Sequence, residues 1–209
     1  MKLQAALDFD NLRDALALME VIHPYVDIAE IGTPLMLAEG TRAVAEVKRR
    51  YPSIDVLADM KIMDGGESIA GIAFRAGADI VTVLGVTNDA TISGVVQAAR
   101  HFGKRAFADT LAVTNLAERT RQLDKLGVDY ISVHTAYDLR DCIRTPIDAL
   151  KVIQANLTHA KSAISGGVNV AIMPEIRTVG PEIVIVGSAL TTAQDPLAVA
   201  RALRKAMDE

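Results

Sequence analysis

Charged residues interrupt a segment that otherwise has the composition of a buried strand. The segment LADMKIMDGG contains Asp59, Lys61 and Asp64 among apolar residues. Because alternate residues of a strand share one face, Asp59 and Lys61 are expected to point the same way. Burying such charges without partners costs several kcal/mol each. The segment therefore predicts mutual pairing, a bound metal or a charged substrate.

Polar side chains also close most of the other apolar runs of the chain. The candidate site residues at these run ends are Asp8, Glu30, Asp109, His134, Ser165, Gly166, Gly167, Gly187 and Ser188. If the runs are neighbouring strands, Asp8 and Glu30 converge on Asp59 and Lys61. A coincidence of several charged strand ends is difficult to produce by packing alone, so we interpret the cluster as a functional site.

The elements that must position these residues follow a regular alternation. Eight short apolar runs, many of them β-branched, cover residues 3–7, 26–31, 54–59, 79–84, 105–110, 129–134, 162–165 and 182–187. The segments between them have helical spacing. Two apolar stripes illustrate it: one contains Leu37, Gly40, Val44, Val47 and Tyr51, and the other Leu197, Ala200, Leu203 and Met207. FRAGAD, HFGKR and KLGVD each place a glycine between a predicted helix and the next strand, as a C-cap would require.

The alternation predicts one α/β domain over residues 1–209, a single (β/α)8 TIM barrel. Dividing 209 residues among eight units leaves about 26 for each, which suits compact units without insertions. A doubly wound open sheet is the alternative, since it has the same alternation. In a barrel the strand ends carry the function, and glycines after strands seven and eight expose backbone N–H groups to a phosphate.

Composition excludes several other classes. The net charge is −4, the basic residues are not clustered and there are eight Phe and Tyr with no Trp, which argues against nucleic acid as a partner. No apolar run is long enough to span a membrane, and charge comes too early for a secretory signal. The single Cys142 cannot form an internal disulfide and has no activating neighbour, so we interpret it as a bystander. We expect a cytoplasmic protein.

Each candidate also has a structural interpretation. Asp59 and Lys61 could form only an ion pair, Asp64 only a turn, and His134 a hydrogen-bonded barrel histidine. The glycines could form tight turns without binding anything. We favour a purely structural role for Asp10, as the N-cap of the helix that follows it. The remaining histidines are expected on the surface; these are His23, His101 and His159.

The chain resembles the orotidine-5′-monophosphate decarboxylase superfamily through the Asp-x-Lys-x-x-Asp pattern of Asp59, Lys61 and Asp64. Within it, MKLQAALD, VDIAEIGTPL, LADMKIMDGGE, GADIVTVLG and VGSALTTAQDP are similar to segments of the 3-hexulose-6-phosphate synthases. The resemblance covers essentially the whole chain. It implies a homodimeric barrel of the ribulose-phosphate-binding type. Such a barrel would bind Mg²⁺ and condense D-ribulose 5-phosphate with formaldehyde, through an enediolate, to D-arabino-3-hexulose 6-phosphate.

The resemblance also implies a role for each residue. Glu30 and Asp59 are the implied Mg²⁺ ligands, Lys61 the group that stabilises the enediolate, and His134 the proton carrier. The glycine turns would bind the phosphate. The other implied roles are Asp8 and Asp64 as groups that orient the lysine and bind substrate hydroxyls, Asp64 in the neighbouring subunit's site, and Asp109 as a group that orders a water or the substrate.

Two alternatives remain. The 3-keto-L-gulonate-6-phosphate decarboxylases resemble one another in having Glu at the position of Asp109, and Arg after the sixth-strand His and the eighth-strand Gly. This chain has Asp109, Thr135-Ala136-Tyr137 and Ser188 there, which favours the synthase. Ser165 is nearer to the Thr of the decarboxylases than to the synthase Ala, and FADTLAV is not the usual synthase fifth strand. A non-catalytic sugar-phosphate-binding barrel would have no need of both a metal site and a proton carrier.

Overall fold

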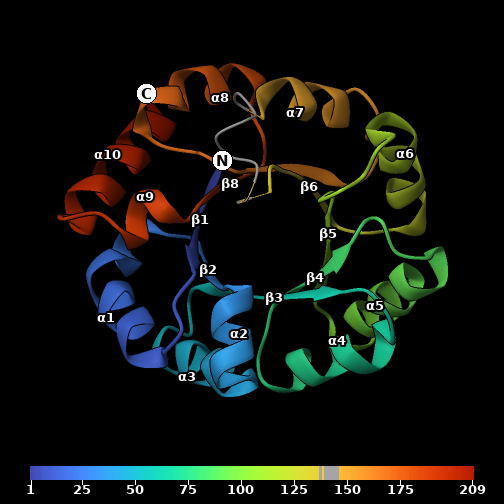
Figure 1. The fold of residues 1–209 in the computed structure, drawn as a ribbon, viewed down its shortest axis with the longest axis horizontal. Coiled ribbons are helices and arrows are strands. Elements are labelled where there is room, and N and C mark those ends of the chain that lie inside the picture. The colour runs from blue at the N-terminus through green and yellow to red at the C-terminus, as the bar shows by residue number, and fades with distance from the viewer. Residues whose placement is uncertain (137, 139–145) are drawn as a thin grey trace.

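The strands form a closed parallel barrel in the order β1 to β8 (Figure 1). The computed structural model describes residues 1–136, 138 and 146–209, so Cys142 and Tyr137 lie outside the described residues. The strands are β1 Lys2–Leu7, β2 Ile28–Ile31, β3 Asp55–Ile62, β4 Ile80–Leu84, β5 Arg105–Asp109, β6 Tyr130–His134, β7 Lys161–Ser165 and β8 Ile183–Val186. β8 pairs with β1, which closes the barrel and excludes the open sheet. The predicted barrel is confirmed.

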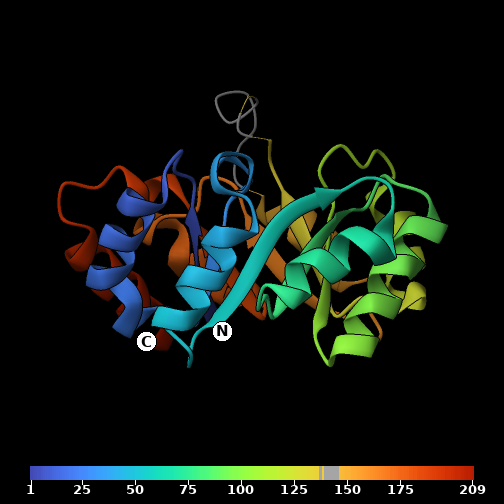
Figure 2. The same ribbon diagram turned by 90° about the horizontal axis from the view of Figure 1, so that it is seen from below.

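Helices form a ring outside the strands (Figure 1). They are α1 Leu12–Ile22, α2 Thr33–Glu39, α3 Thr41–Arg50, α4 Gly66–Arg75, α5 Asp89–Phe102, α6 Leu116–Leu126, α7 Ile147–Gln154, α8 Met173–Val179, α9 Ser188–Thr191 and α10 Pro196–Asp208, with short 3₁₀ turns η1 His23–Tyr25 and η3 Val170–Ile172. Gly103 and Gly127 cap α5 and α6 as the sequence predicts. In Figure 2 the β3 arrow rises, so the C-terminal strand ends face the upper edge, and both chain termini lie near the lower edge.

Side chains fill the centre of the barrel. The inner cluster consists of Ala6, Ile28, Leu57, Ile80, Phe107, Tyr130, Ala163, Ile183 and Ile185. A larger apolar layer lies between the strands and the helices. Burial of one large apolar side chain stabilises a fold by about 1.5–3 kcal/mol, so these two layers supply the main stabilisation and a rigid base for the strand ends. No helix among the described residues is long and apolar enough to cross a membrane.

The apolar stripe predicted between strands two and three is not one continuous helix. The stripe predicted from Leu37 to Tyr51 is interrupted at Gly40, whose φ of 59° ends α2 and starts α3 in a new direction. Leu37 is consequently 83 % exposed, although Val44 and Val47 are buried as expected.

The predicted N-cap of α1 is also misplaced by one residue. Asn11 is the cap, because its side chain accepts a hydrogen bond of 2.9 Å from the Asp14 N–H. Asp10 instead accepts a hydrogen bond from the Asn11 side-chain amide. Both residue types cap helices well, so the sequence alone could not separate them.

Three aspartates bind successive strand pairs together at the N-terminal end of the barrel. Asp27, Asp79 and Asp129 directly precede β2, β4 and β6. Each carboxylate accepts a hydrogen bond from a backbone N–H of the preceding strand: from Leu3 at 2.8 Å, Val56 at 2.9 Å and Ala106 at 2.8 Å, respectively. Each also pairs with a basic side chain of a helix: Arg204 of α10, Lys48 of α3 and Arg100 of α5, respectively. These contacts fix the strand register on which the opposite end depends.

Candidate active site

The charged residues predicted from the sequence gather at the C-terminal end of the barrel. Glu30, Asp59 and Lys61 lie in β2 and β3, and Asp8 directly follows β1. The last residues of β5 and β6 complete the set; these are Asp109 and His134. Parallel strands bring their C-terminal ends to one edge, and six charged or titratable side chains thereby surround one region.

Asp59 is at the centre of a hydrogen-bond network. Its side chain is almost fully buried. The Thr82 hydroxyl donates to Asp59 Oδ1 at 2.8 Å, and the Thr33 hydroxyl lies 2.7 Å from Oδ2. The Lys61 ammonium pairs with the same Oδ2. Both carboxylate oxygens therefore have fixed partners.

Lys61 is held in an unusual backbone conformation. Its φ is 42°, in the left-handed region that residues with a Cβ seldom adopt. Ala58 pairs with Val81 but Ile62 pairs with Val83, so β3 bulges between them. The predicted shared direction of Asp59 and Lys61 is confirmed by their ion pair, although a bulge rather than simple alternation produces it. Burial opposes the charge of Lys61, but Asp59, Asp109 and Glu30 together outweigh burial, so the pKa of Lys61 is raised.

Glu30 is buried beside Asp59. Gln4 of β1 donates from Nε2 to Glu30 Oε2 at 2.6 Å. Burial, followed by repulsion from Asp59, raises the pKa of Glu30 to about 8. Without an added cation, the site thus favours a protonated Glu30 at neutral pH.

Asp8 lies close to this pair. A Cβ at Gly32 would stand 2.1 Å from Asp8 Oδ1, so glycine is required where β2 ends. Desolvation, with repulsion from Asp59, raises the pKa of Asp8, while Lys61 and His134 lower it. The carboxylates of Asp8, Glu30 and Asp59 are thus electrostatically coupled around one lysine.

Asp109 and His134 form a dyad at the ends of the neighbouring strands β5 and β6. His134 Nδ1 lies 2.7 Å from Asp109 Oδ2, while Asp109 Oδ1 accepts from the Leu111 N–H at 2.9 Å. When Nδ1 carries the proton donated to Asp109, Nε2 of a neutral His134 has its lone pair free. The dyad gives Asp109 a structural partner that the sequence did not identify.

Asp64 does not join the cluster within its own chain. It is exposed, in the loop after β3, and its Oδ1 accepts from the Gly65 N–H at 2.7 Å.

Two glycine turns follow β7 and β8. Gly166 and Gly167 have φ values of 95° and 69°, and a Cβ on Gly166 would come within 2.9 Å of Thr135. Ser165 donates to the Val133 carbonyl. After β8, Gly187 leads into α9, which begins at Ser188. These bare backbone turns lie at the same barrel end as the charged cluster.

The carboxylate oxygens of this cluster suit a hard cation whose remaining coordination positions are filled by other ligands. Three carboxylates share a region with one lysine, and burial has already raised the pKa of Glu30. Mg²⁺ usually takes one or two protein carboxylates, with substrate oxygens and water as the remaining ligands. Among the residues described, no group of three or more His, Cys, Asp or Glu side chains is arranged to hold a metal ion. Glu30 and Asp59 therefore fit a partial site of this kind.

The sequence missed the neutral members of the site. Thr33, Thr82 and Gln4 all contact the charged residues. Their signal was present: Gln4 and Thr82 are the polar residues inside the apolar strands KLQAAL and IVTVL. A buried strand residue that is polar calls for a partner.

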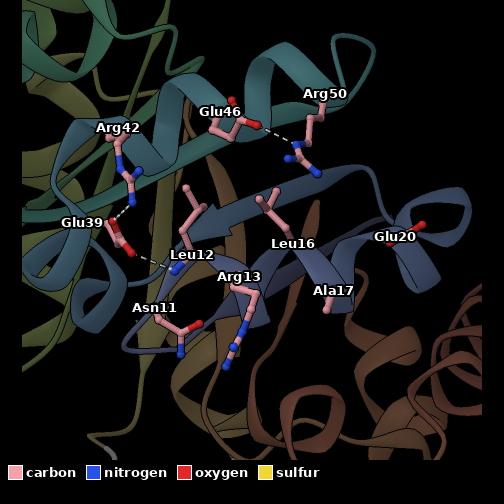
Figure 3. A pocket seen from close by; sticks show the side chains of 10 residues that line it. All are labelled: Asn11, Leu12, Arg13, Leu16, Ala17, Glu20, Glu39, Arg42, Glu46 and Arg50. Atoms are coloured by element: carbon pink, nitrogen blue, oxygen red, sulfur yellow. Dashed lines mark hydrogen bonds and ion pairs between the residues drawn. The ribbon is translucent and has the colours of Figure 1, made fainter.

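One surface groove lies away from these strand ends. It has a volume of about 1000 Å³ and is lined mainly by α1 and α3 (Figure 3). Four of its six charged side chains pair with one another: Arg42 with Glu39, and Arg50 with Glu46 at 2.7 Å. Glu39 also accepts from the Leu12 N–H. We therefore interpret this groove as a helix contact rather than a reaction site.

Comparisons with known proteins agree with this geometry. Residues 1–203 match the model of the "Orotidine 5'-phosphate decarboxylase / HUMPS family". The chain is 42 % identical over 205 residues to 3-hexulose-6-phosphate synthase of Bacillus subtilis, covering 98 % of each chain. The crystal structure of 3-hexulose-6-phosphate synthase from Salmonella typhimurium superposes with a TM-score of 0.96 at 42 % identity, covering 99 % of this chain and 98 % of that one.

A more distant structure belongs to the alternative activity. The 3-keto-L-gulonate-6-phosphate decarboxylase from Vibrio cholerae has a TM-score of 0.88 at 28 % identity, over 99 % of this chain and 97 % of that one. The fold is thus common to both activities, while the greater identity is with the synthases. The chain belongs to the orotidine 5′-phosphate decarboxylase / HUMPS family and, within it, to the family of the 3-hexulose-6-phosphate synthases.

Proposed function

We propose that this chain condenses D-ribulose 5-phosphate with formaldehyde to give D-arabino-3-hexulose 6-phosphate. The observation that carries the proposal is the Asp59–Lys61 ion pair, which lies next to buried Glu30 at the C-terminal strand ends. The chain around this pair is similar over its full length to a 3-hexulose-6-phosphate synthase. A binding protein has no evident use for such a costly arrangement together with the Asp109–His134 dyad.

We assign Glu30 and Asp59 as Mg²⁺ ligands. This assignment is supported by the burial of Glu30 beside a second carboxylate: burial, followed by repulsion from Asp59, raises the pKa of Glu30 to about 8, and a bound cation would offset both. When bound, Mg²⁺ would supply positive charge to the substrate oxygens that become negative during the reaction. Lys61, which keeps its proton because of Asp59, supplies a second positive charge to the enediolate.

His134 is the proposed proton carrier. Nε2 removes a proton from C1 of ribulose 5-phosphate, and the electron pair of that C–H bond forms the enediolate. C1 then attacks the carbonyl carbon of formaldehyde, and a new carbon–carbon bond replaces the carbonyl π bond. The former formaldehyde oxygen takes up a proton, which balances the one removed. Asp109 orients His134 through Nδ1, a contact that supports this role.

The remaining residues are assigned to binding. Asp8 faces the substrate hydroxyls beside Lys61, a position supported by its coupling to Asp59, Lys61 and His134. Backbone N–H groups at Gly166, Gly167, Gly187 and Ser188 bind the phosphate, as glycine turns after strands seven and eight do in such barrels, and Ser165 borders them.

We further propose a homodimer in which Asp64 serves the partner's site. Its exposure and its lack of contact with the cluster of its own chain support this assignment. Exposed apolar side chains lie on or beside the neighbouring elements α2, β3, α4 and β4; they are Leu37, Met63, Ile72 and Val86, with exposures of 83 %, 53 %, 45 % and 41 %. A second copy would cover such side chains. A cytoplasmic location is also a proposal, supported by the single cysteine.

A parallel assay tests the activity. Purified protein is incubated with Mg²⁺, ribulose 5-phosphate and formaldehyde, and separately with Mg²⁺ and 3-keto-L-gulonate 6-phosphate. We expect formaldehyde to disappear only when both ribulose 5-phosphate and the metal are present. Faster CO₂ release from the ketogulonate would assign the decarboxylase activity instead. Binding of sugar phosphate without turnover in either assay would indicate a non-catalytic barrel.

A further inference from the structure

Thr82 occupies a position where an apolar residue would be expected. It lies in β4 between Val81 and Val83 and is only 4 % exposed. Burying a hydroxyl is unfavourable unless it forms hydrogen bonds. The Thr82 hydroxyl forms two, and both lead to the proposed catalytic machinery.

One of these bonds completes the bulge in β3. Between the pairs Ala58–Val81 and Ile62–Val83, three residues of β3 stand opposite Thr82 alone. The Lys61 N–H has no ladder partner there and donates to Thr82 Oγ1 at 3.0 Å. The hydroxyl thus replaces a backbone acceptor at the residue whose φ is 42°.

The second bond fixes the carboxylate. Because Thr82 Oγ1 accepts from Lys61, its own proton is available for Asp59 Oδ1, 2.8 Å away. The other oxygen, Oδ2, is then directed to the Lys61 ammonium. A single side chain therefore links the backbone of Lys61 to the carboxylate that its ammonium contacts.

We infer that Thr82 is a positioning residue, which holds the strained Lys61 backbone and the Asp59 carboxylate in the arrangement that the reaction uses. Valine has nearly the same shape but provides neither bond. In Thr82→Val the Lys61 N–H and Asp59 Oδ1 both lose a buried partner, and the bulge loses the contact that offsets its strain. The inference rests on the proposed function for its kinetic consequences, but not for its geometric ones.

Four residue types at position 82 distinguish the effect of the hydroxyl group from the effect of side-chain volume. Thr and Ser have the hydroxyl, whereas Val and Ala lack it. We expect Thr82→Val and Thr82→Ala to lower kcat and the affinity for Mn²⁺, measured by electron paramagnetic resonance without substrate, about 10- to 100-fold, the usual effect of losing a residue that orients a ligand. KM for ribulose 5-phosphate should change much less. Thr82→Ser should recover most of both losses.

A matched control exists in α6. Thr120 is fully buried and its hydroxyl has no partner among the described residues. Thr120→Val makes the same atomic change without removing a hydrogen bond, and should leave kcat and Mn²⁺ affinity unchanged. If activity followed side-chain volume instead, with Val equal to Thr and Ser equal to Ala, the positioning role would be refuted.

A crystal structure of Thr82→Val tests the geometry without any assay. We expect Lys61 to leave the left-handed region or Asp59 to rotate away from its present orientation. Should the variant not crystallise or fold, the comparison of Thr82→Ser with Thr82→Ala decides the matter. An unchanged Lys61 and Asp59 would overturn this inference alone, whereas failure of the wild-type chain to consume formaldehyde would overturn the proposed function alone.

Discussion

Glu30 makes the free energy of unfolding depend on pH and on a bound cation. Its folded-state pKa of about 8 lies above the ordinary value of 4.5, so the folded chain holds a proton that the unfolded chain has released between these pH values. The free energy of unfolding contributed by this group therefore falls as pH rises from about 4.5 to 8.

Replacement of Glu30 by Gln should remove this fall in the free energy of unfolding, because Gln does not titrate. In metal-free buffer, we expect Glu30→Gln to be more stable than the wild type at pH 8, by an amount on the order of a few kcal/mol, and to differ little near pH 4.5. Urea unfolding at both pH values measures this. Equal stability of the two proteins at pH 8 would show that Glu30 is not held in its neutral form. Mg²⁺ should stabilise the wild type and not the variant.

The dyad provides a second prediction at this scale. His134→Asn should slow exchange of the C1 proton of ribulose 5-phosphate with D₂O, without formaldehyde, by about 10²- to 10⁴-fold. Because Asp109 acts through His134, Asp109→Ala should slow it less, and the double variant should be no slower than His134→Asn. Independent, additive losses would show that Asp109 touches the substrate itself, and unchanged exchange in His134→Asn would place the base elsewhere.

Individual charged residues were predictable because charge inside an apolar strand has few structural explanations. Their neutral partners were missed. Gln4 and Thr82, as polar residues inside apolar strands, signalled a need for partners but not which ones, and Thr33 gave no such signal. The contact between Asp109 and His134 joins residues 25 apart in the sequence, and pairing across strands requires the register that only the structure provides.

At the scale of elements, Asp79 connects β3 and β4 to α3 and to the segment between α5 and β5. Its carboxylate accepts from the Val56 N–H at 2.9 Å and pairs with Lys48 at 2.8 Å and Lys104 at 2.6 Å. Burial raises its pKa, but these hydrogen bonds outweigh burial and the pKa of Asp79 is lowered. A lowered folded-state pKa stabilises the fold above the unfolded value of about 3.8, and this stabilisation is lost as pH falls below it.

Asp79→Asn should therefore reduce the free energy of unfolding at pH 7 by about 1–3 kcal/mol. The difference from the wild type should shrink toward pH 3. The control is Asp148→Asn, because Asp148 pairs with Lys151 but its side chain is 95 % exposed, and such pairs contribute about 0–1 kcal/mol. Equal effects of the two substitutions in urea unfolding would contradict a structural role for Asp79.

Strands were easier to predict than helix breaks. All eight strands lie where the apolar runs predict them, within a few residues. The break at Gly40 was missed because steps of three and four continue across it, and a stripe does not reveal a backbone turn with φ of 59°. The bulge at Lys61 was hidden for a similar reason: alternation predicts the right side-chain direction without the extra residues.

At the scale of the whole molecule, eight repeated units in 209 residues left few possible folds. The closure of β8 on β1 confirms the barrel. Assembly is different, because exposed apolar residues such as Leu37 follow from the helix break that the stripe concealed. The shared-site dimer therefore stays a prediction.

Subunit mixing tests the shared site. Lys61→Ala and Asp64→Asn homodimers should each be nearly inactive. If Asp64 serves the partner's site, a mixed dimer has one site lacking both groups and one intact. Random pairing makes about half the dimers mixed, so joint refolding should restore about a quarter of wild-type activity, as expected for a two-fold dimer. If Asp64 serves its own chain, mixing restores nothing.

The reaction proposed for this barrel forms a carbon–carbon bond between formaldehyde and C1 of ribulose 5-phosphate. The most direct measurement is ¹³C NMR of a reaction containing ¹³C-labelled formaldehyde, ribulose 5-phosphate, Mg²⁺ and the protein, with Asp59→Ala as the control. We expect the label to appear in the C1 hydroxymethyl carbon of a six-carbon 3-ulose phosphate, and Asp59→Ala to slow this by at least about 100-fold. Label that stays in formaldehyde with the wild-type protein, or enters product equally fast with Asp59→Ala, would contradict the proposed reaction.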